Sequence, residues 1–207
     1  LQDVAEDLLQ SQRFFKIPHE FRFTATYPAP EFTMQYGESL YEYLLYRLEE
    51  QGAYFYFAPD EDKIIFADAP ESHDTPLTNA AYSPGTGLEV GRLNEIITSF
   101  SLQQTPLPRE VVVRSYDWKN PQKVIVGQAD VSDEGTGCVY LSSENVETDS
   151  DATRIAKIRA EELKAHARLF HATSQIPLFR PGSLFTLEKH FTKRFNQDYM
   201  ILEITHE

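Results

Sequence analysis

The segment from Ser39 to Phe57 constrains the fold of this 207-residue chain more than any other feature. Ser39 is followed three residues later by Glu42, the capping-box spacing in which each residue satisfies a free backbone N–H of the other. The apolar side chains that follow fall on one helical stripe: Leu40, Tyr43, Leu44 and Leu48. Gly52 then supplies the left-handed conformation that ends many helices. The sequence therefore predicts a helix near residues 39–51 that packs one face into a core.

Two strands leave directly from this predicted helix. Residues 54–58 and 63–67 are rich in aromatic and β-branched side chains, and a turn at residues 59–62 separates them. Such a pair predicts a β-hairpin, because two short apolar runs joined by turn residues pair most readily with each other. An amphipathic helix is also predicted at the start of the chain, from the spacing of Leu1, Val4, Ala5, Leu8 and Leu9.

The rest of the chain favours strands. The 14 Phe, 11 Tyr and 12 Pro of the sequence are typical of a mainly β protein with a few helices. Strand-like runs lie at residues 21–24, 96–102, 111–116, 124–128, 139–141, around Phe185 and Leu187, and from Met200 to Ile204. A second helix is predicted near residues 151–165, and residues 169–176 fit either its continuation or a strand. The predicted class is therefore α+β.

A boundary is predicted between residues 76 and 91. Pro84, Gly85, Gly87 and Gly91 interrupt any regular pattern there, which divides the chain into an α/β segment of residues 1–90 and a β segment of residues 91–207. The first helix has no N-cap before it, and the last strand pattern runs to the end. Both ends are therefore expected to be cut from a longer polypeptide.

Composition argues against several classes of function. A formal net charge of −13 repels nucleic acid and anionic lipid surfaces, so neither is expected as a partner. No apolar stretch approaches the roughly 18 residues of a membrane span, so membrane insertion is not expected. The single cysteine, Cys138, excludes an internal disulfide framework, and its place at the start of an apparent strand predicts a packing role.

Motifs for metal or cofactor chemistry are incomplete. The six histidines never pair at the i, i+4 spacing of a helical zinc site, so they are interpreted as lone surface or edge residues: His19, His73, His166, His171, His190 and His206. Asp130, Ser132, Glu134 and Gly135 resemble the opening of a calcium loop, but Leu141 occupies the position that requires a bidentate carboxylate. A solvated acidic loop is the better interpretation. We predict no metal and no cofactor.

Catalytic motifs are also missing from the sequence. It contains no G-x-S-x-G elbow, phosphate-binding loop or dinucleotide fingerprint, and its 32 carboxylates are too many for any acid pair to be diagnostic. A tyrosine cluster could stack sugars, but helical spacing assigns Tyr43 to the core and Tyr41 and Tyr46 to a flank or an interface. No catalytic residue is predicted, and the chain is not expected to be an enzyme.

The helix segment also carries a family resemblance. Residues 35–57, QYGESLYEYLLYRLEEQGAYFYF, closely resemble the signature of VgrG proteins and related phage tail hubs. Tyr43 stands where the family usually has Phe, and Arg47 is displaced by one position, which puts a role for the arginine in doubt. Residues 113–118, 181–190 and 199–206 resemble the family as well and follow in the same order.

The resemblance implies a structural role. It suggests β-barrel domains of the phage tail hub type with an inserted α/β segment, in a spike protein of a type VI secretion apparatus. The implied partners are two further copies in a homotrimer of the full-length protein, an Hcp-like tail tube protein, and a downstream needle with its tip protein. The implied location is assembly in the bacterial cytoplasm, followed by translocation with the apparatus. The alternatives are a baseplate hub of a contractile-tailed phage or prophage and a carbohydrate-binding module.

Overall fold

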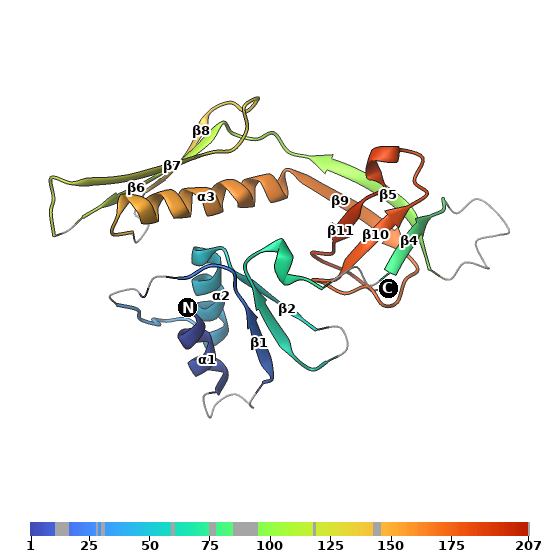
Figure 1. Cartoon of the computed structure of the whole chain (residues 1–207), viewed down its shortest axis with the longest axis horizontal. Coiled ribbons are helices and arrows are strands. Elements are labelled where there is room, and N and C mark those ends of the chain that lie inside the picture. The colour runs from blue at the N-terminus through green and yellow to red at the C-terminus, as the bar shows by residue number, and fades with distance from the viewer. Residues whose placement is uncertain are drawn as a thin grey trace. The chain divides into compact units, whose positions relative to one another are not determined.

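The structure is a computed structural model that describes residues 1–10, 17–27, 29, 32–58, 61–74, 78–84, 95–117, 119–142 and 146–206. The chain forms two compact units (Figure 1). The first unit comprises residues 1–49, 53–101 and 171–207, and the second comprises residues 50–52 and 102–170. The fold is mainly β with helices (α+β), as predicted from the sequence.

The first unit begins with two helices and a small sheet. Helices α1 (Gln2–Gln10) and α2 (Leu40–Gln51) pack with strands β1 (His19–Arg22), β2 (Tyr54–Phe57) and β3 (Ile64–Ala67). The strand order is β1-β3-β2, with β1 parallel and β2 antiparallel to β3. The core cluster consists of Ala5, Leu9, Leu44, Leu48, Ala53 and Phe66. The predicted N-terminal helix and hairpin are both confirmed, although residues 59 and 60 of the turn lie outside the described residues.

Helix α2 has the ends that the sequence predicts. The Ser39 backbone N–H donates to Glu42 Oε2 at 2.8 Å, and the Glu42 N–H donates to Ser39 Oγ at 3.2 Å, which completes the capping box. Tyr43, Leu44 and Leu48 of the predicted stripe are buried. Gly52 ends the helix at φ 71°, a conformation that favours glycine.

A five-stranded sheet is built from strands that are distant in sequence. Its order is β11-β10-β4-β5-β9, and its members are β4 (Thr78–Tyr82), β5 (Ile96–Gln104), β9 (Arg168–Ser174), β10 (Leu184–Glu188) and β11 (Asp198–Met200). Strand β4 lies between β10 and β5 and is parallel to both. Residues 168–174 therefore form a strand rather than a continued helix. The sheet also places β4 and β5, which flank the predicted boundary at residue 90, side by side.

The compact units differ from the predicted division into residues 1–90 and 91–207. The parallel pairing of β4 with β5 holds the two sides of that boundary in one unit, and the main part of the second unit begins only after Ser101. The signal for the boundary was a run of glycines and proline, which marks a long connection whether or not a new unit follows it. Residues 85–94 of that connection lie outside the described residues.

The predicted C-terminal strand is too long. Strand β11 ends at Met200, and Ile201 makes the last ladder-like contacts, with Gly182 and Ser183. The alternation of Leu202 and Ile204 with polar residues is strand-like, but a pattern becomes a strand only where another backbone lies beside it. The prediction that the strand continues to residue 204 is therefore wrong in this structure.

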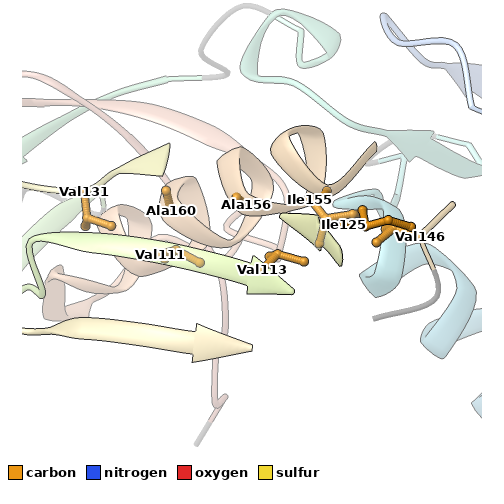
Figure 2. Close-up of a cluster of buried hydrophobic side chains, with 9 residues drawn as sticks. Val111, Val113, Ile125, Val131, Val146, Ile155, Ala156 and Ala160 are labelled. Atoms are coloured by element: carbon orange, nitrogen blue, oxygen red, sulfur yellow. The ribbon is translucent and has the colours of Figure 1, made fainter. Parts of the chain in front are cut away.

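The second unit is a helix on a three-stranded sheet. Its strands are β6 (Glu110–Tyr116), β7 (Val124–Asp130) and β8 (Cys138–Ser142), in the order β7-β6-β8, and helix α3 (Asp149–His166) covers one face. Figure 2 shows Val111, Val113 and Ile125 beneath the apolar face of α3. The helix begins slightly before the predicted start because Thr148 is its N-cap and accepts from the Asp151 N–H at 3.1 Å.

Candidate functional site

An exposed row of aromatic rings is the most prominent feature of the signature segment. Tyr41 of α2 meets Phe55 of β2 edge to face at 6.5 Å between ring centroids, and Phe55 meets Phe57 in the same way at 6.0 Å. Tyr41 is 59% exposed and Phe57 62% exposed. Phe55 in turn packs on the fully buried Phe66, with ring centroids 5.9 Å apart. We call Tyr41, Phe55 and Phe57 the aromatic face.

The aromatic face has the properties of a protein-binding surface. Its rings are large and lose little conformational entropy on binding, because contact with one another and with the core already restricts them. Other large apolar side chains in this segment or just before it are also exposed: Phe32, Met34, Tyr36, Leu45 and Tyr46. Exposed apolar groups in such numbers are typical of a surface that another protein covers.

The tyrosines do not form a platform for sugars. Tyr43 is 8% exposed and belongs to the core, as helical spacing predicted, whereas Tyr41 and Tyr46 are exposed on α2. Sugar-binding tyrosines would have to lie together on one flat sheet face. These two project from a helix, which favours the predicted flank or interface role over the carbohydrate-binding alternative.

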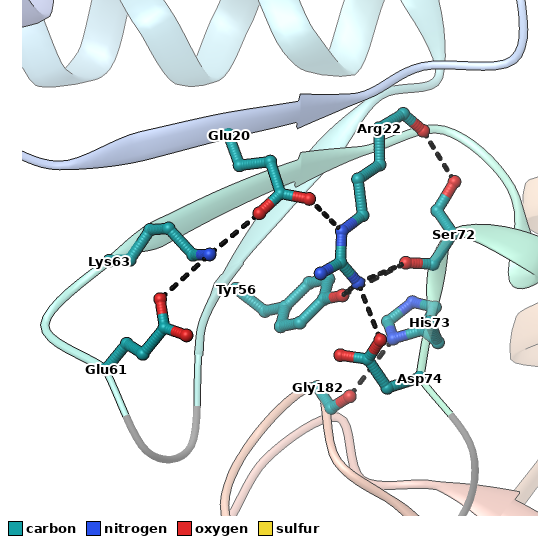
Figure 3. A network of polar contacts seen from close by, with 9 residues as sticks. All are labelled: Glu20, Arg22, Tyr56, Glu61, Lys63, Ser72, His73, Asp74 and Gly182. Carbon is teal, nitrogen blue, oxygen red and sulfur yellow. Dashed lines mark hydrogen bonds and ion pairs between the residues drawn. The ribbon is translucent and has the colours of Figure 1, made fainter.

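A polar network centred on Arg22 links the strands of the small sheet to the segment that follows them (Figure 3). Arg22 Nε donates to Glu20 Oε1 at 2.7 Å, and its Nη1 donates to Asp74 Oδ1 at 3.1 Å and to the Ser72 carbonyl at 3.2 Å. Lys63 Nζ donates to the other oxygen of Glu20 at 2.8 Å. The hydrogen bonds from Arg22 and then from Lys63 lower the pKa of Glu20 to about 2.

His73 contacts two tyrosine rings. Its ring stacks on Tyr56 at 4.6 Å and on Tyr54 at 5.7 Å between centroids. Nδ1 lies 3.1 Å from the Gly182 carbonyl, which can only accept, so Nδ1 carries the proton. Nε2 is then the acceptor for the Tyr54 hydroxyl at 2.7 Å. Burial lowers the pKa of His73 and raises the pKa of Tyr54 to about 12, so both are neutral at pH 7.

This polar network is a structural clasp. Each of its polar side chains bonds to another member or to the backbone. Gly182 lies so close that an added Cβ would be 2.5 Å from Tyr56 Cβ. The network therefore fastens β2 to the turn before β10.

Comparison with known protein families shows to which family this chain belongs. Residues 1–207, the whole chain, match the family described as phage tail baseplate hub (GPD). The chain belongs to the phage tail baseplate hub family. Proteins of this family are structural hubs or spikes, so the aromatic face and the clasp are parts of a hub.

Relatives of the hub chain include two VgrG proteins of Vibrio cholerae. The chain is 24% identical over 187 residues to the actin cross-linking toxin VgrG1 of strain O395, and 21% identical over 183 residues to the type VI secretion system spike protein VgrG3 of strain N16961. Each match covers 86% of this chain, but only 16% and 18% of the two relatives. The resemblance to VgrG proteins predicted from the sequence is confirmed, and this chain spans less than a fifth of their length.

Two solved structures share the hub fold. One is the 43 kDa tail protein of prophage MuSo2 from Shewanella oneidensis, with a TM-score of 0.66 at 10% identity over 95% of this chain and 59% of that one. The other is a tail protein from Neisseria meningitidis MC58, with a TM-score of 0.59 at 15% identity over 89% of this chain and 54% of that one. At these identities the likeness establishes the fold alone.

Two interpretations of single residues in the hub chain are corrected. Cys138 was expected to pack in the core, but it is exposed at the start of β8. Val139 and Leu141 are the residues of that strand whose side chains pack against the core. The histidines were interpreted as surface or edge residues, yet His190 is 4% exposed and His73 half-buried. Aromatic rings on other strands help to bury both histidines, and no local spacing indicates these contacts.

The acidic loop and the histidines do not gather into a metal site in the described residues. Within those ranges, His, Cys, Asp and Glu form no group of three or more that could hold a metal ion. None of the helices described combines the length and apolarity that crossing a bilayer requires. The clasp was missed by sequence reasoning, although Glu20 and Arg22 stand two residues apart on one side of a strand, which is a detectable sign of a pair.

The clasp predicts a specific pH dependence for the hub chain. Because Glu20 has a folded pKa of about 2 against an ordinary value of 4.5, its contribution to stability is complete above pH 4.5. It is lost as the pH falls from 4.5 towards 2. Replacing Glu20 with Gln should therefore flatten the loss of unfolding free energy between pH 5 and pH 2.5, measured by urea denaturation. Asp62→Asn, in the exposed hairpin turn, is the control and should leave that slope unchanged.

Proposed function

We propose that this chain is part of a trimeric adaptor between the tail tube and the needle of a contractile injection apparatus. The observation that carries the proposal is the family match over the whole chain, together with the exposed aromatic face in the signature segment. The role is structural: the aromatic face binds another hub subunit, and the clasp keeps the strand that bears Phe57 in place. No catalytic residue is assigned.

The apparatus is proposed to be a type VI secretion system. Both named relatives are VgrG proteins, and one is described as a type VI spike protein. On this proposal the chain contacts an Hcp-like tube protein and a downstream needle with its tip protein. It is assembled in the cytoplasm and leaves the cell with the apparatus. A phage or prophage baseplate hub is the alternative, which the family name and the tail-protein fold favour.

Trimer formation is tested on the complete polypeptide that carries this chain. Light scattering should give a trimer for it, and a weaker oligomer for the 207-residue chain alone, because contacts elsewhere in the polypeptide raise the effective concentration of each hub contact. A complete polypeptide that stays monomeric at micromolar concentration contradicts the adaptor role. Release into the medium that depends on a tube protein distinguishes secretion from a phage particle.

The aromatic face is tested by charge. Tyr41→Asp with Phe57→Asp should weaken trimerisation of the complete polypeptide about tenfold or more, a cost of at least about 1.4 kcal/mol, because an interface would have to bury two carboxylates. Tyr116→Asp is the matched control, since Tyr116 is 63% exposed on the other unit. Analytical ultracentrifugation measures the dissociation constants. If the control and the double variant weaken trimerisation equally, the proposal that the aromatic face lies in the interface is wrong.

A further inference from the structure

The turn between β10 and β11 collects positive charge on an acidic chain. Lys189, Lys193 and Arg194 are exposed within six residues, whereas the whole chain carries a net charge of −13. The sequence holds no carboxylate from residue 189 to residue 197. Among the described residues, none of these three cations forms an ion pair. Lys189 and Lys193 are therefore available to an external anion, and so is Arg194, whose guanidinium carbon lies 5.4 Å from the centre of the Phe195 ring. We call residues 189–194 the basic turn.

An aromatic ring stands in the middle of these charges. Phe191 is 79% exposed and stacks on the buried ring of His190, with centroids 4.3 Å apart and planes at 28°. Tyr82 meets the same phenylalanine edge to face at 5.9 Å. A ring that rests on a buried support loses little freedom on binding, so Phe191 is preorganised as an apolar anchor.

The backbone of the basic turn is fixed by the same histidine. Asn196 Oδ1 accepts from the His190 N–H at 2.8 Å, and Asn196 Nδ2 donates to the His190 carbonyl at 3.0 Å. His190 Nδ1 accepts from the Thr192 N–H at 3.0 Å, which leaves the proton of the neutral ring on Nε2. The backbone of Lys189 has φ 63°, a conformation that residues other than glycine rarely adopt.

This geometry has a cost in folding free energy. Nε2 of His190 is buried without a hydrogen-bond partner among the described residues, and contact with the surrounding aromatic rings offsets that loss only in part. Lys189 adds strain. Such features persist where the surrounding structure enforces them, and they concentrate at sites that hold a group in position for binding. Here the group held outward is Phe191.

We propose that the basic turn is a docking site for an acidic segment of a different protein chain. Carboxylates of that segment pair with Lys189, Lys193 and Arg194, and one of its apolar side chains covers Phe191. This surface is distinct from the aromatic face, and the inference does not rest on the proposed trimer. The proposed partner is recognised by its negative charge and by one apolar side chain that covers Phe191.

The charge pattern selects a protein over other anions. Membrane-binding clusters commonly hold four to eight basic residues, and the basic turn holds three. A nucleic acid extends well beyond one turn, so the acidic remainder of the chain would repel it. A second copy of this chain also carries −13, and the single exposed ring of the basic turn, Phe191, offsets that repulsion less than the several exposed apolar side chains around the aromatic face do. A short acidic peptide segment meets only the positive region.

The test is an NMR titration of the ¹⁵N-labelled chain with a Glu-rich peptide that has one central Phe. Peptide binding should shift the amide signals of residues 188–197. Lys189→Glu with Lys193→Glu should weaken binding about tenfold or more, and so should an increase in ionic strength from about 0.05 to 0.5 M. Phe191→Ala should weaken binding to the Phe-containing peptide but not to a Glu-rich peptide that has Ala in its place.

Matched controls come from the end of β6 and the turn after it, where Tyr116 and Lys123 are exposed. Tyr116→Ala and Lys123→Glu should leave peptide binding unchanged. A thermal melt of each variant verifies that the chain remains folded. The proposal is overturned by wild-type protein that does not bind the peptide, or by binding that charge reversal in the basic turn does not weaken. Stronger binding at this turn to double-stranded DNA or to phosphatidylserine vesicles would overturn the assignment to a protein partner.

Discussion

Leu44→Asp is expected to abolish cooperative folding of the first unit, or to reduce its free energy of unfolding by about 4 kcal/mol or more. Leu44 is 8% exposed and belongs to the cluster that contains Leu48 and Phe66. Removing a buried leucine side chain costs about 2–5 kcal/mol, and the new carboxyl group must also be desolvated or protonated. Domains have about 5–15 kcal/mol of stability in total, so the loss is decisive.

The neighbouring residue supplies the control. Leu45 is 37% exposed on the same helix, so Leu45→Asp makes the same chemical change one position away with its carboxylate in water. Urea denaturation followed by circular dichroism should separate the two variants by at least about 3 kcal/mol. Equal stability of the two variants would mean that the face of α2 towards the core has been assigned incorrectly.

Helix α2 and the hairpin after it could be predicted because their signals are local. The capping box, the apolar stripe and Gly52 all lie within one short segment, and β2 pairs with the next strand along the chain. Local agreement between cap, pattern and turn specifies an element before any tertiary contact forms. The same reasoning gave α3, whose N-cap, Thr148, lies within a few residues of the predicted start.

The five-stranded sheet could not be predicted in this way. Strand β4 pairs in parallel with β10, more than a hundred residues later, and parallel partners leave no turn signature between them. The buried state of His190 follows from that sheet, because its aromatic neighbours Tyr82 and Phe100 lie on β4 and β5. Helical spacing predicts only which side of a helix a residue lies on. It assigned Tyr41 to a flank or an interface, but it could not predict the contact between Tyr41 and Phe55.

Gly127→Ala is expected to destabilise the second unit by about 3 kcal/mol. Gly127 lies on the inward side of β7, directly beneath α3. An added Cβ would lie 2.1 Å from the carbonyl carbon of Ala152 and 2.2 Å from the Thr153 nitrogen. Both atoms belong to the helix backbone, so no side-chain rotation can relieve the contact. The helix would have to move away from the sheet, which would open the core that Ile125 and Ala156 share.

The measurement is urea denaturation followed by circular dichroism, because helix α3 supplies much of the helical signal of the second unit. The midpoint should be lower for Gly127→Ala. Gln128→Ala is the control, since residue 128 is exposed on the opposite side of the same strand and its truncation leaves the contact with α3 intact. An unchanged midpoint for Gly127→Ala would contradict the close approach of α3 to β7. Helix and strand backbones can approach this closely only where a residue without a side chain separates them, so this glycine sets the spacing of the two layers.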